Sequence, residues 1–214
     1  MKKYILQFIS IVVMGIVFST VATAQSFEGI IEFKKETPTD TINYVYYVKD
    51  YLVRIDEIGT KSHKAEGTFL IDMDQKTMKS LNHDRKLYMD QPTPAAPTLK
   101  GTCTVTKADV KNLQGYKCVG YVVTNTEENT KISYWVADGK FSFFEKLLRQ
   151  LNRKDKSSVY FLQIPSIKNS FPMLSVQQSL DGKDQMRLEV TKIIKKEVDP
   201  TMFDVPRDYN KFEN

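Results

Sequence analysis

The sequence predicts a mostly β fold in which antiparallel strands are joined by short turns and one amphipathic helix packs on the sheet. Two observations predict the strands. Apolar and polar residues alternate along most of the chain after residue 25, and Asp, Asn, Gly and Pro interrupt the alternation at short intervals. A third observation, one stretch with helical spacing of its apolar residues, predicts the helix. Parallel strands would need a crossover helix between each pair, so the pattern favours an antiparallel sheet.

The alternation predicts about eleven strands. Their expected ranges are 27–35, 41–49, 51–58, 66–73, 77–82, 86–90, 102–108, 113–125, 130–137, 174–180 and 185–196. Pro92, Pro94 and Pro97 remove three backbone donors from the stretch between the sixth and seventh strands, so we expect a surface loop there.

Both faces of the predicted sheet carry apolar side chains. In residues 41–49, Tyr44 and Tyr46 point to one face while Val45 and Tyr47 point to the other. A sheet that is apolar on both faces needs cover on both, and a curved sheet with a helix lying against it supplies such cover.

Residues 141–151 have the spacing of an amphipathic helix. Their apolar positions, at i, i+3, i+6, i+7 and i+10, are Phe141, Phe144, Leu147, Leu148 and Leu151. Charged and amide side chains occupy the other face. Asp138 and Gly139 form a turn signal before the helix, which we expect to dock on the sheet.

The first 24 residues have the features of a cleavable secretory signal peptide. Lys2 and Lys3 supply a positive start, an apolar run follows, and small residues end at Ala24, before Gln25. The alternative is an uncleaved anchor, because the run is nearly long enough to span a bilayer. A lipid anchor would need a cysteine in the place of Gln25. We expect residues 25–214 to form a single domain, periplasmic or secreted, with no integral membrane anchor.

The charge of the chain is mild. The formal net charge is +5, and removal of Lys2 and Lys3 lowers it to +3. The basic residues are spread along the sequence, with the densest stretches at 149–156 and 192–196. Spread charge in an exported protein argues against nucleic acid as a partner and leaves a membrane surface as the better anionic partner.

Cys103 and Cys118 are the only cysteines, and export would place them where disulfides form. If residues 109–112 make a four-residue turn, the two cysteines face each other across one hairpin. Such a bridge stabilises a fold by about 3 kcal/mol in the chain-entropy model. We therefore expect a structural disulfide between Cys103 and Cys118. A redox-active pair would have the spacing Cys-x-x-Cys near a helix N-terminus.

The sequence offers no convincing catalytic or metal-binding motif. His63 and His83 are the only histidines and lack ligand spacing, and Asp72-Met73-Asp74 lacks the remainder of a calcium loop. The nucleophile motifs Gly-x-Ser-x-Gly and Ser-x-x-Lys find no convincing match. We expect no metal ion, no cofactor and no enzymatic activity.

The aromatic and aliphatic side chains leave two interpretations open. They form an ordinary core, or some of them line a cavity between sheet and helix that accepts an acyl chain or a similar ligand. An apolar cavity on the order of several hundred Å³ would favour a carrier, and a fully packed core would favour an interaction module. The residues expected to line the cavity are Tyr44, Tyr46, Phe69, Tyr134, Trp135, Phe141, Phe144 and Leu148.

Four segments carry a family resemblance. They are Phe27-Glu28-Gly29-Ile30-Ile31, Gly115-Tyr116-Lys117-Cys118, Ser133-Tyr134-Trp135-Val136-Ala137, and residues 198–209 with Phe203-Asp204-Val205-Pro206 and Tyr209. The chain resembles a family of uncharacterised exported proteins of Gram-negative envelopes, a domain of unknown function. That family is similar in shape to the periplasmic lipoprotein carriers and their outer-membrane receptors.

The resemblance implies an open antiparallel half-barrel with the helix packed on its concave face and an apolar pocket there. It transfers neither a ligand nor a functional residue. Because the chain lacks the N-terminal cysteine of the lipid-anchored receptors, the likeness is to the soluble carriers. We expect a soluble periplasmic binding or carrier protein for a lipid-like or other hydrophobic ligand. The alternative is an envelope protein–protein interaction module without a small-molecule ligand.

Overall fold

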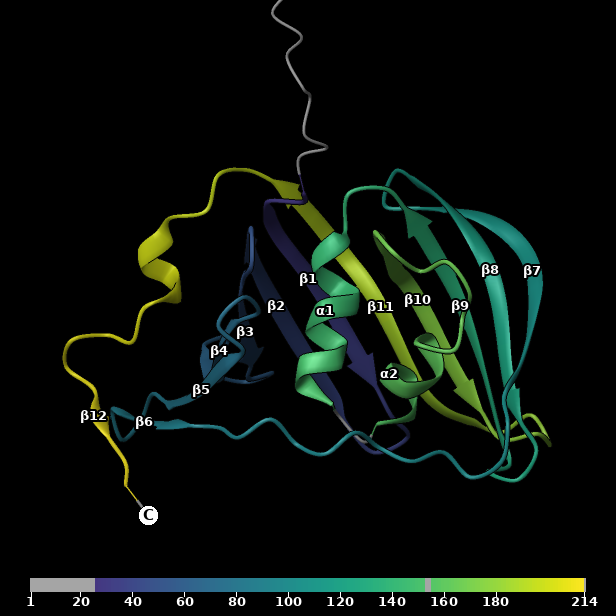
Figure 1. Cartoon of the computed structure of the whole chain (residues 1–214), viewed down its shortest axis with the longest axis horizontal. Helices are drawn as coiled ribbons and strands as arrows, with labels where there is room; N and C mark the ends of the chain where they lie inside the picture. Colours follow the sequence, from purple (N-terminus) through teal and green to yellow (C-terminus); the bar gives the residue numbers. More distant parts are fainter. Residues whose placement is uncertain (1–25, 153–154, 214) are drawn as a thin grey trace, which may run out of the picture.

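The computed structural model describes residues 26–152 and 155–213 of the chain (Figure 1). Within them, one sheet holds the strands β1 Gly29–Glu36, β2 Thr41–Lys49, β3 Leu52–Ile58, β4 Ala65–Asp72, β5 Thr77–Asn82, β6 Leu87–Asp90, β7 Thr104–Leu113, β8 Tyr116–Asn125, β9 Thr130–Asp138, β10 Ser170–Gln178, β11 Asp184–Lys195 and β12 Asn210–Lys211. The helices are α1 Ser142–Leu151, α2 Lys156–Phe161 and the short 3-10 helix η1 Pro200–Phe203.

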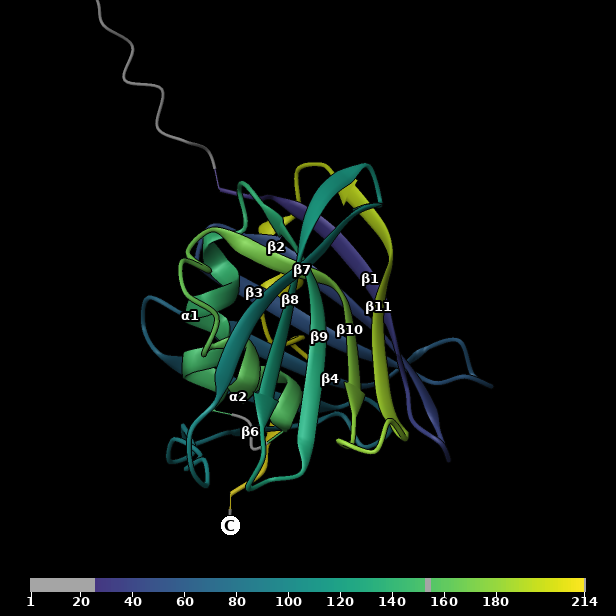
Figure 2. The same ribbon diagram turned by 90° about the vertical axis from the view of Figure 1, so that its right-hand side faces the viewer.

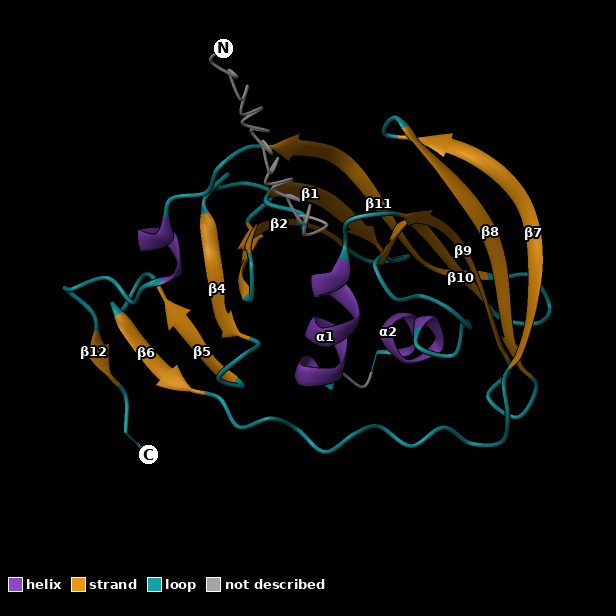
Figure 3. Cartoon of the chain, turned by 45° about the horizontal axis from the view of Figure 1, so that its top comes forward, coloured by secondary structure: helices purple, strands orange, loops and turns teal. Residues whose placement is uncertain are grey.

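The sheet is antiparallel and open. Its strand order is β12-β6-β5-β4-β3-β2-β1-β11-β10-β9-β8-β7, and only β12 pairs in parallel, with β6. The strands curve around α1 and α2, which both lie on the concave side (Figures 2 and 3). The predicted fold class, an open antiparallel half-barrel with a helix on its concave face, is therefore confirmed. The signal peptide prediction concerns residues outside the described part of the chain.

Helix α1 forms where the apolar spacing predicts it. It buries Phe143, Phe144, Leu147, Leu148 and Leu151. The helix ends at residue 152, an asparagine in the left-handed conformation, which is a common helix terminator. Within the part of the chain that the structure covers, no helix is long and apolar enough to cross a membrane.

Helix α2 and strand β12 are absent from the sequence prediction. Helix α2 has only six residues, too few to show a helical period, and its clearest signal is the N-cap Asp155, whose carboxylate accepts the amide N–H of Ser158. Strand β12 has two residues, both exposed, so no alternation marks it. Short elements of this kind depend on tertiary contacts more than on local pattern.

The hairpin of β7 and β8 differs from the prediction. Its turn is at Gln114 and Gly115, which both have positive φ angles, as a two-residue hairpin turn requires. Strand β7 continues through the expected turn by a bulge at residues 108 and 109. A Cβ atom on Gly120 of β8 would lie 2.4 Å from the Asp109 carbonyl oxygen, so the bulge needs glycine there.

The true register separates the two cysteines. Cys118 lies opposite Lys111, whereas Cys103 precedes Thr104, which pairs with Thr124 at the other end of the hairpin. Both cysteines are free thiols, and Cys103 accepts a hydrogen bond from Asn125 at 3.7 Å. The predicted disulfide between Cys103 and Cys118 is therefore wrong, because its assumed turn was misplaced. Burial raises the pKa of both thiols.

Residues 198–212, which we call the C-terminal strap, run from the end of β11 to β12, and the Arg54 Nη1 of β3 donates to the Met202 carbonyl of the strap at 3.3 Å. A chain of hydrogen bonds runs beneath it. The Arg54 Nε donates to Asp56 at 2.8 Å, and the Thr68 hydroxyl donates to the same carboxylate oxygen at 2.6 Å. The hydroxyl of Thr68 also lies 2.7 Å from His83 Nε2, and the Tyr209 hydroxyl lies 2.6 Å from His83 Nδ1. Because the Thr68 hydrogen points to Asp56, His83 Nε2–H donates to Thr68 and Nδ1 accepts from Tyr209.

We expect two titratable thiols without prior reduction. In denaturant, unreduced protein should take up two alkyl groups, detected by mass spectrometry. In the native protein Cys118 should react far more slowly than a free thiol, because it is fully buried and its pKa is raised. Unreduced protein that resists alkylation in denaturant would contradict the register described above.

Removal of the Tyr209 hydroxyl should loosen the strap. We expect Tyr209→Phe to lower the free energy of unfolding by about 1 kcal/mol, because it leaves His83 Nδ1 without its donor. Urea unfolding measures the change. Tyr51→Phe is the matched control, since Tyr51 is half exposed and makes no hydrogen bond through its hydroxyl in the described part of the chain. Equal unfolding midpoints for the two variants would refute a role for the strap bond.

Candidate ligand-binding site

A cavity lies on the concave face between the helices and the middle of the sheet. Its volume is about 80 Å³. Strands β1, β2, β10 and β11 supply one wall, and α1 and α2 supply the other. The cavity is lined by Phe33, Lys35, Tyr44, Tyr46, Phe144, Leu148, Leu151, Asp155, Ser157, Ser158, Phe161, Phe171, Pro172, Ser175 and Leu188.

The floor of the cavity is aromatic because strand alternation and the helix face bring rings together. Phe33 of β1 stacks on Tyr44 at 5.2 Å and meets the edge of Tyr46 at 4.7 Å between ring centroids. From the helix side, the ring of Phe144 lies 4.4 Å from that of Phe171 and 5.4 Å from that of Phe161. Offset and edge-to-face pairs of this kind stabilise an apolar wall beyond the area they bury.

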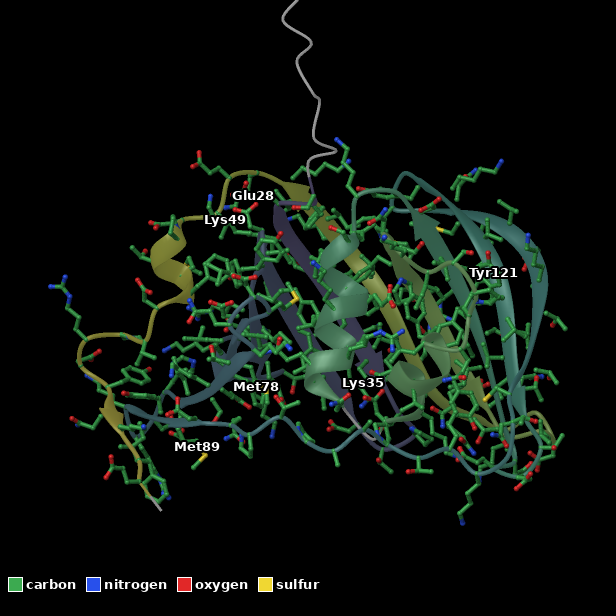
Figure 4. The ribbon with its side chains drawn as sticks, viewed as in Figure 1. Glu28, Lys35, Lys49, Met78, Met89 and Tyr121 are labelled. Carbon is green, nitrogen blue, oxygen red and sulfur yellow. The ribbon has the colours of Figure 1, made fainter. Side chains whose placement is uncertain are left out.

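The mouth of the cavity is polar. Lys35 lines it from the end of β1, beside the C-terminal half of α1 (Figure 4), and makes no ion pair with any described residue. Asp155, Ser157 and Ser158 line it from the start of α2. The Asp155 carboxylate accepts the Ser158 amide and hydroxyl, both at 3.0 Å, and the Ser157 hydroxyl. A cation without a partner beside an apolar floor suits an amphipathic molecule.

Four of the eight predicted residues line this cavity: Tyr44, Tyr46, Phe144 and Leu148. Tyr134 is fully buried beside α2, and its hydroxyl donates to the Ser157 carbonyl at 2.7 Å. Phe141 packs with other rings beyond the cavity, and Phe69 lies on β4.

Trp135 lies on the convex face, which corrects its expected place in the cavity. Its neighbour Tyr134 faces the helices, and successive side chains of a strand point to opposite faces. The Trp135 indole N–H donates to Asp109 at 3.1 Å, and the Lys111 ammonium lies 3.5 Å from the indole ring centre.

Sequence reasoning missed most of the remaining lining. Phe33, Lys35 and Leu188 alternate correctly within their strands, but nothing in the sequence shows that β1 and β11 are neighbours at the centre of the sheet. Phe161 belongs to α2, which was not predicted. Only the pairing of β1 with β11 shows that these residues meet, and the sequence does not reveal that pairing.

Helix α2 is held by polar contacts. The Tyr160 hydroxyl donates to Glu128 at 2.7 Å, and the Lys156 ammonium donates to the Thr130 hydroxyl at 2.8 Å. The Lys100 amide and the Tyr160 hydroxyl hold the pKa of Glu128 below its ordinary value. Burial raises the pKa of Tyr134 well above its usual range, so its hydroxyl remains a donor to α2.

The groups around the cavity can bind a ligand through apolar contacts and hydrogen bonds. Among residues 26–152 and 155–213, no three His, Cys, Asp or Glu side chains gather in a way that could hold a metal ion. At about 80 Å³ the cavity is smaller than the several hundred Å³ expected of a carrier, and smaller than the roughly 300–1,000 Å³ typical of small-molecule pockets. It has room for a few water molecules or a short stretch of chain. A larger ligand requires the helices to move.

Comparison with known proteins identifies a family and a fold. A family model described as a domain of unknown function, DUF4412, matches residues 27–209, and no curated protein matches the sequence. An uncharacterised conserved protein from Thermus thermophilus has a TM-score of 0.55 with 10% identity, covering 87% of this chain and 90% of that one. This likeness shows a shared fold.

Two further structures are more distant. A chain of the Pseudomonas aeruginosa MucA/MucB complex has a TM-score of 0.49 with 11% identity, covering 86% of this chain and 56% of that one. A putative outer membrane lipoprotein-sorting protein domain from Vibrio parahaemolyticus has a TM-score of 0.31 with 8% identity, covering 82% and 88%. Both scores are too low to support a further statement.

Glu128 should make the attachment of α2 sensitive to acid. A carboxyl whose pKa is lowered in the folded state stabilises the fold above its ordinary pKa of 4.5, and this stabilisation is lost as the pH falls through the lowered value. We expect Glu128→Gln to lower the urea midpoint at pH 7 and to flatten its fall as the pH drops below 4.5. Glu127→Gln, an exposed neighbour, should keep both the midpoint and the acid limb. An unchanged acid limb in Glu128→Gln would contradict this assignment.

Proposed function

Because the chain belongs to the DUF4412 family, a domain of unknown function, we propose its function from the geometry of the concave face. The protein binds the apolar part of a lipid-like or other amphipathic ligand between its curved sheet and its helices. The observation that carries the proposal is the apolar cavity with a polar mouth, lined by both layers of the fold. The proposed activity is binding without catalysis, and no cofactor takes part in it.

The ligand enters by displacement of helix α1. The cavity of about 80 Å³ is the closed state, and outward movement of α1 enlarges it. The helix packs on the sheet mainly through apolar side chains, so an acyl chain replaces contacts of the same kind. Residues with unusual backbone conformations lie at both ends of the helix. They are Gly139, with φ of 150°, and Asn152, with φ of 42°.

The polar mouth orients the ligand. Lys35 stands at the end of the apolar floor without an ion pair in the described structure, and Ser157 and Ser158, whose hydroxyls donate to Asp155, line the same cavity. A ligand with an apolar tail buried against Phe33 and Phe144 therefore presents its polar head to these side chains. The head remains near solvent, so its desolvation costs little.

One observation favours the second candidate function, an envelope interaction module. Strand β7 is the edge of the sheet and, among the described strands, pairs with β8 alone, so its outer backbone groups are available to a partner strand. Val110 on this strand is 52% exposed. However, Lys107, Lys111 and the bulge are features that protect edges from pairing. The cavity therefore supports ligand binding more strongly.

Filling the cavity should abolish ligand binding. We expect Leu188→Trp to weaken binding of a fluorescent fatty acid by about tenfold or more, because the indole occupies the apolar space. Leu180→Trp is the matched control, since Leu180 lies exposed at the turn after β10 and outside the cavity. Fluorescence titration measures both affinities. Wild-type affinity in Leu188→Trp would contradict the proposed location.

Native mass spectrometry tests the function without a chosen probe. Protein purified gently from the periplasm of its own bacterium should carry an apolar small molecule that is absent from Leu188→Trp. A uniformly ligand-free wild-type protein would overturn the proposal. A stoichiometric bound polypeptide in its place would support the interaction module.

A further inference from the structure

A second cavity lies at the opposite end of β1 from the first. Its volume is about 540 Å³, and it is lined by Ser26, Phe27, Glu28, Tyr116, Gly139, Lys140, Phe141, Lys195, Lys196 and Glu197. Glu28 and Lys49 mark this end of the sheet, whereas Lys35 marks the end near the first cavity (Figure 4). The beginning of β1, the end of β11 and the loop between β9 and α1 meet here.

The acidic residues of this cavity form ion pairs, whereas its lysines do not form ion pairs with described residues. Lys140, Lys195 and Lys196 make no ion pair with a described residue. The two acids are engaged by a fourth lysine, because Lys49 lies 2.7 Å from Glu28 and 3.9 Å from Glu197. Glu28 also accepts the Val198 amide at 2.9 Å, and its bond to Lys49 holds its pKa below the ordinary value. The cavity therefore keeps an excess of positive charge with no internal partner.

Tyr116 provides an unused hydrogen-bond donor at the same place. Its hydroxyl oxygen is buried and has no hydrogen-bond partner among the described residues. A buried hydroxyl without a partner costs free energy, and such groups are rare in folded proteins. The Lys195 ammonium lies 5.1 Å from the centre of the Tyr116 ring and is exposed enough to change its position. A ligand oxygen that draws Lys195 off the ring would satisfy both groups.

The floor of this cavity is aromatic and closely packed. The rings of Phe27 and Phe141 stack at 5.3 Å between centroids, and Tyr116 packs on Phe141 at 5.5 Å. The amide of Phe27 donates to the Lys140 carbonyl at 2.6 Å, which fixes the start of the described chain to the loop before α1. The aromatic floor is thus formed by elements that are packed on one another.

We propose that this second cavity is a phosphate site, in which Lys140, Lys195 and Lys196 bind the anion and the Tyr116 hydroxyl donates to one of its oxygens. Three ammonium groups and a hydroxyl supply more donors than the two oxygens of a carboxylate use, whereas a phosphate offers three or four oxygens. The phosphate belongs either to the free anion or to the head of a lipid whose apolar part lies on Phe27 and Phe141. This site does not depend on the first cavity.

Isothermal titration calorimetry of the purified protein with two probes tests the proposal. Sodium phosphate represents the free anion, and dihexanoyl phosphatidic acid represents a lipid head. Tighter binding of phosphatidic acid identifies a lipid phosphate, and equal binding of the two probes identifies the free anion. Both results support the site, and binding should weaken as salt is raised. Binding of neither probe at low salt overturns it.

Variants separate a specific site from general positive charge. We expect Lys195→Gln to weaken binding about fivefold or more, whereas Lys117→Gln should bind as wild type, since Lys117 is exposed on the same strand as Tyr116 and points to the other face. Tyr116→Phe should weaken binding about fivefold. Its urea midpoint should not fall, because the hydroxyl has no partner among the described residues to lose. The assignment would be refuted if Lys195→Gln and Lys117→Gln lost the same amount of phosphate affinity, or if Tyr116→Phe bound phosphate with wild-type affinity. Leu188→Trp should bind phosphate as the wild type does. Loss of ligand binding at the first cavity can therefore be told apart from loss of phosphate binding at the second.

Discussion

Cover of the concave face by α1 is the interaction on which the rest of the structure depends. An open sheet cannot bury its own inner face by closing into a barrel, so its apolar side chains need another layer. The phenylalanines of α1 supply it. Phe143 and Phe144 interlock with Phe171 of β10, and Phe27 is stacked on Phe141 just before the helix. Dense ring packing of this kind contributes much of the buried area of a small core.

The same interaction separates the two cavities. The cluster of rings around Phe141 and Phe171 fills the middle of the concave face, while the first cavity lies toward the end of α1 and the second toward its beginning. One is apolar with a polar mouth, and the other is basic with an aromatic floor. Helix α1 lines the first cavity, and its N-cap residue Phe141 lines the second.

The strands could be predicted because their pattern is local. The ranges predicted for residues 41–49 and 77–82 match β2 and β5 to the residue. The β7–β8 hairpin failed because a bulge lets β7 run through a stretch with the composition of a turn, while Gln114-Gly115 makes a turn with little sequence signal. The predicted turn was misplaced by a few residues. In the true register Cys103 and Cys118 therefore lie toward opposite ends of the hairpin instead of facing each other.

The candidate site could be predicted only in part, because it depends on which strands are neighbours. Tyr44 and Tyr46 share a face of their strand by alternation, and Phe144 and Leu148 share a face of their helix by helical period. The sequence could therefore predict that these four residues line the cavity. Phe33 and Leu188 meet them through pairing of β1 with β11, at a separation along the chain that no local pattern encodes. Tyr134 and Trp135 are adjacent in one strand and cannot both face the cavity. Choosing between them required the register of the whole sheet.

The central position of β1 has a consequence for how the chain reaches its folded state. One of its two neighbours, β2, follows it directly, but the other, β11, lies near the far end of the sequence, and the C-terminal strap comes later still. Loop closure over so long a distance makes folding slow. Until β11 is available, β1 has a partner on one side only, so the centre of the sheet is completed only when nearly the whole chain can take part in folding.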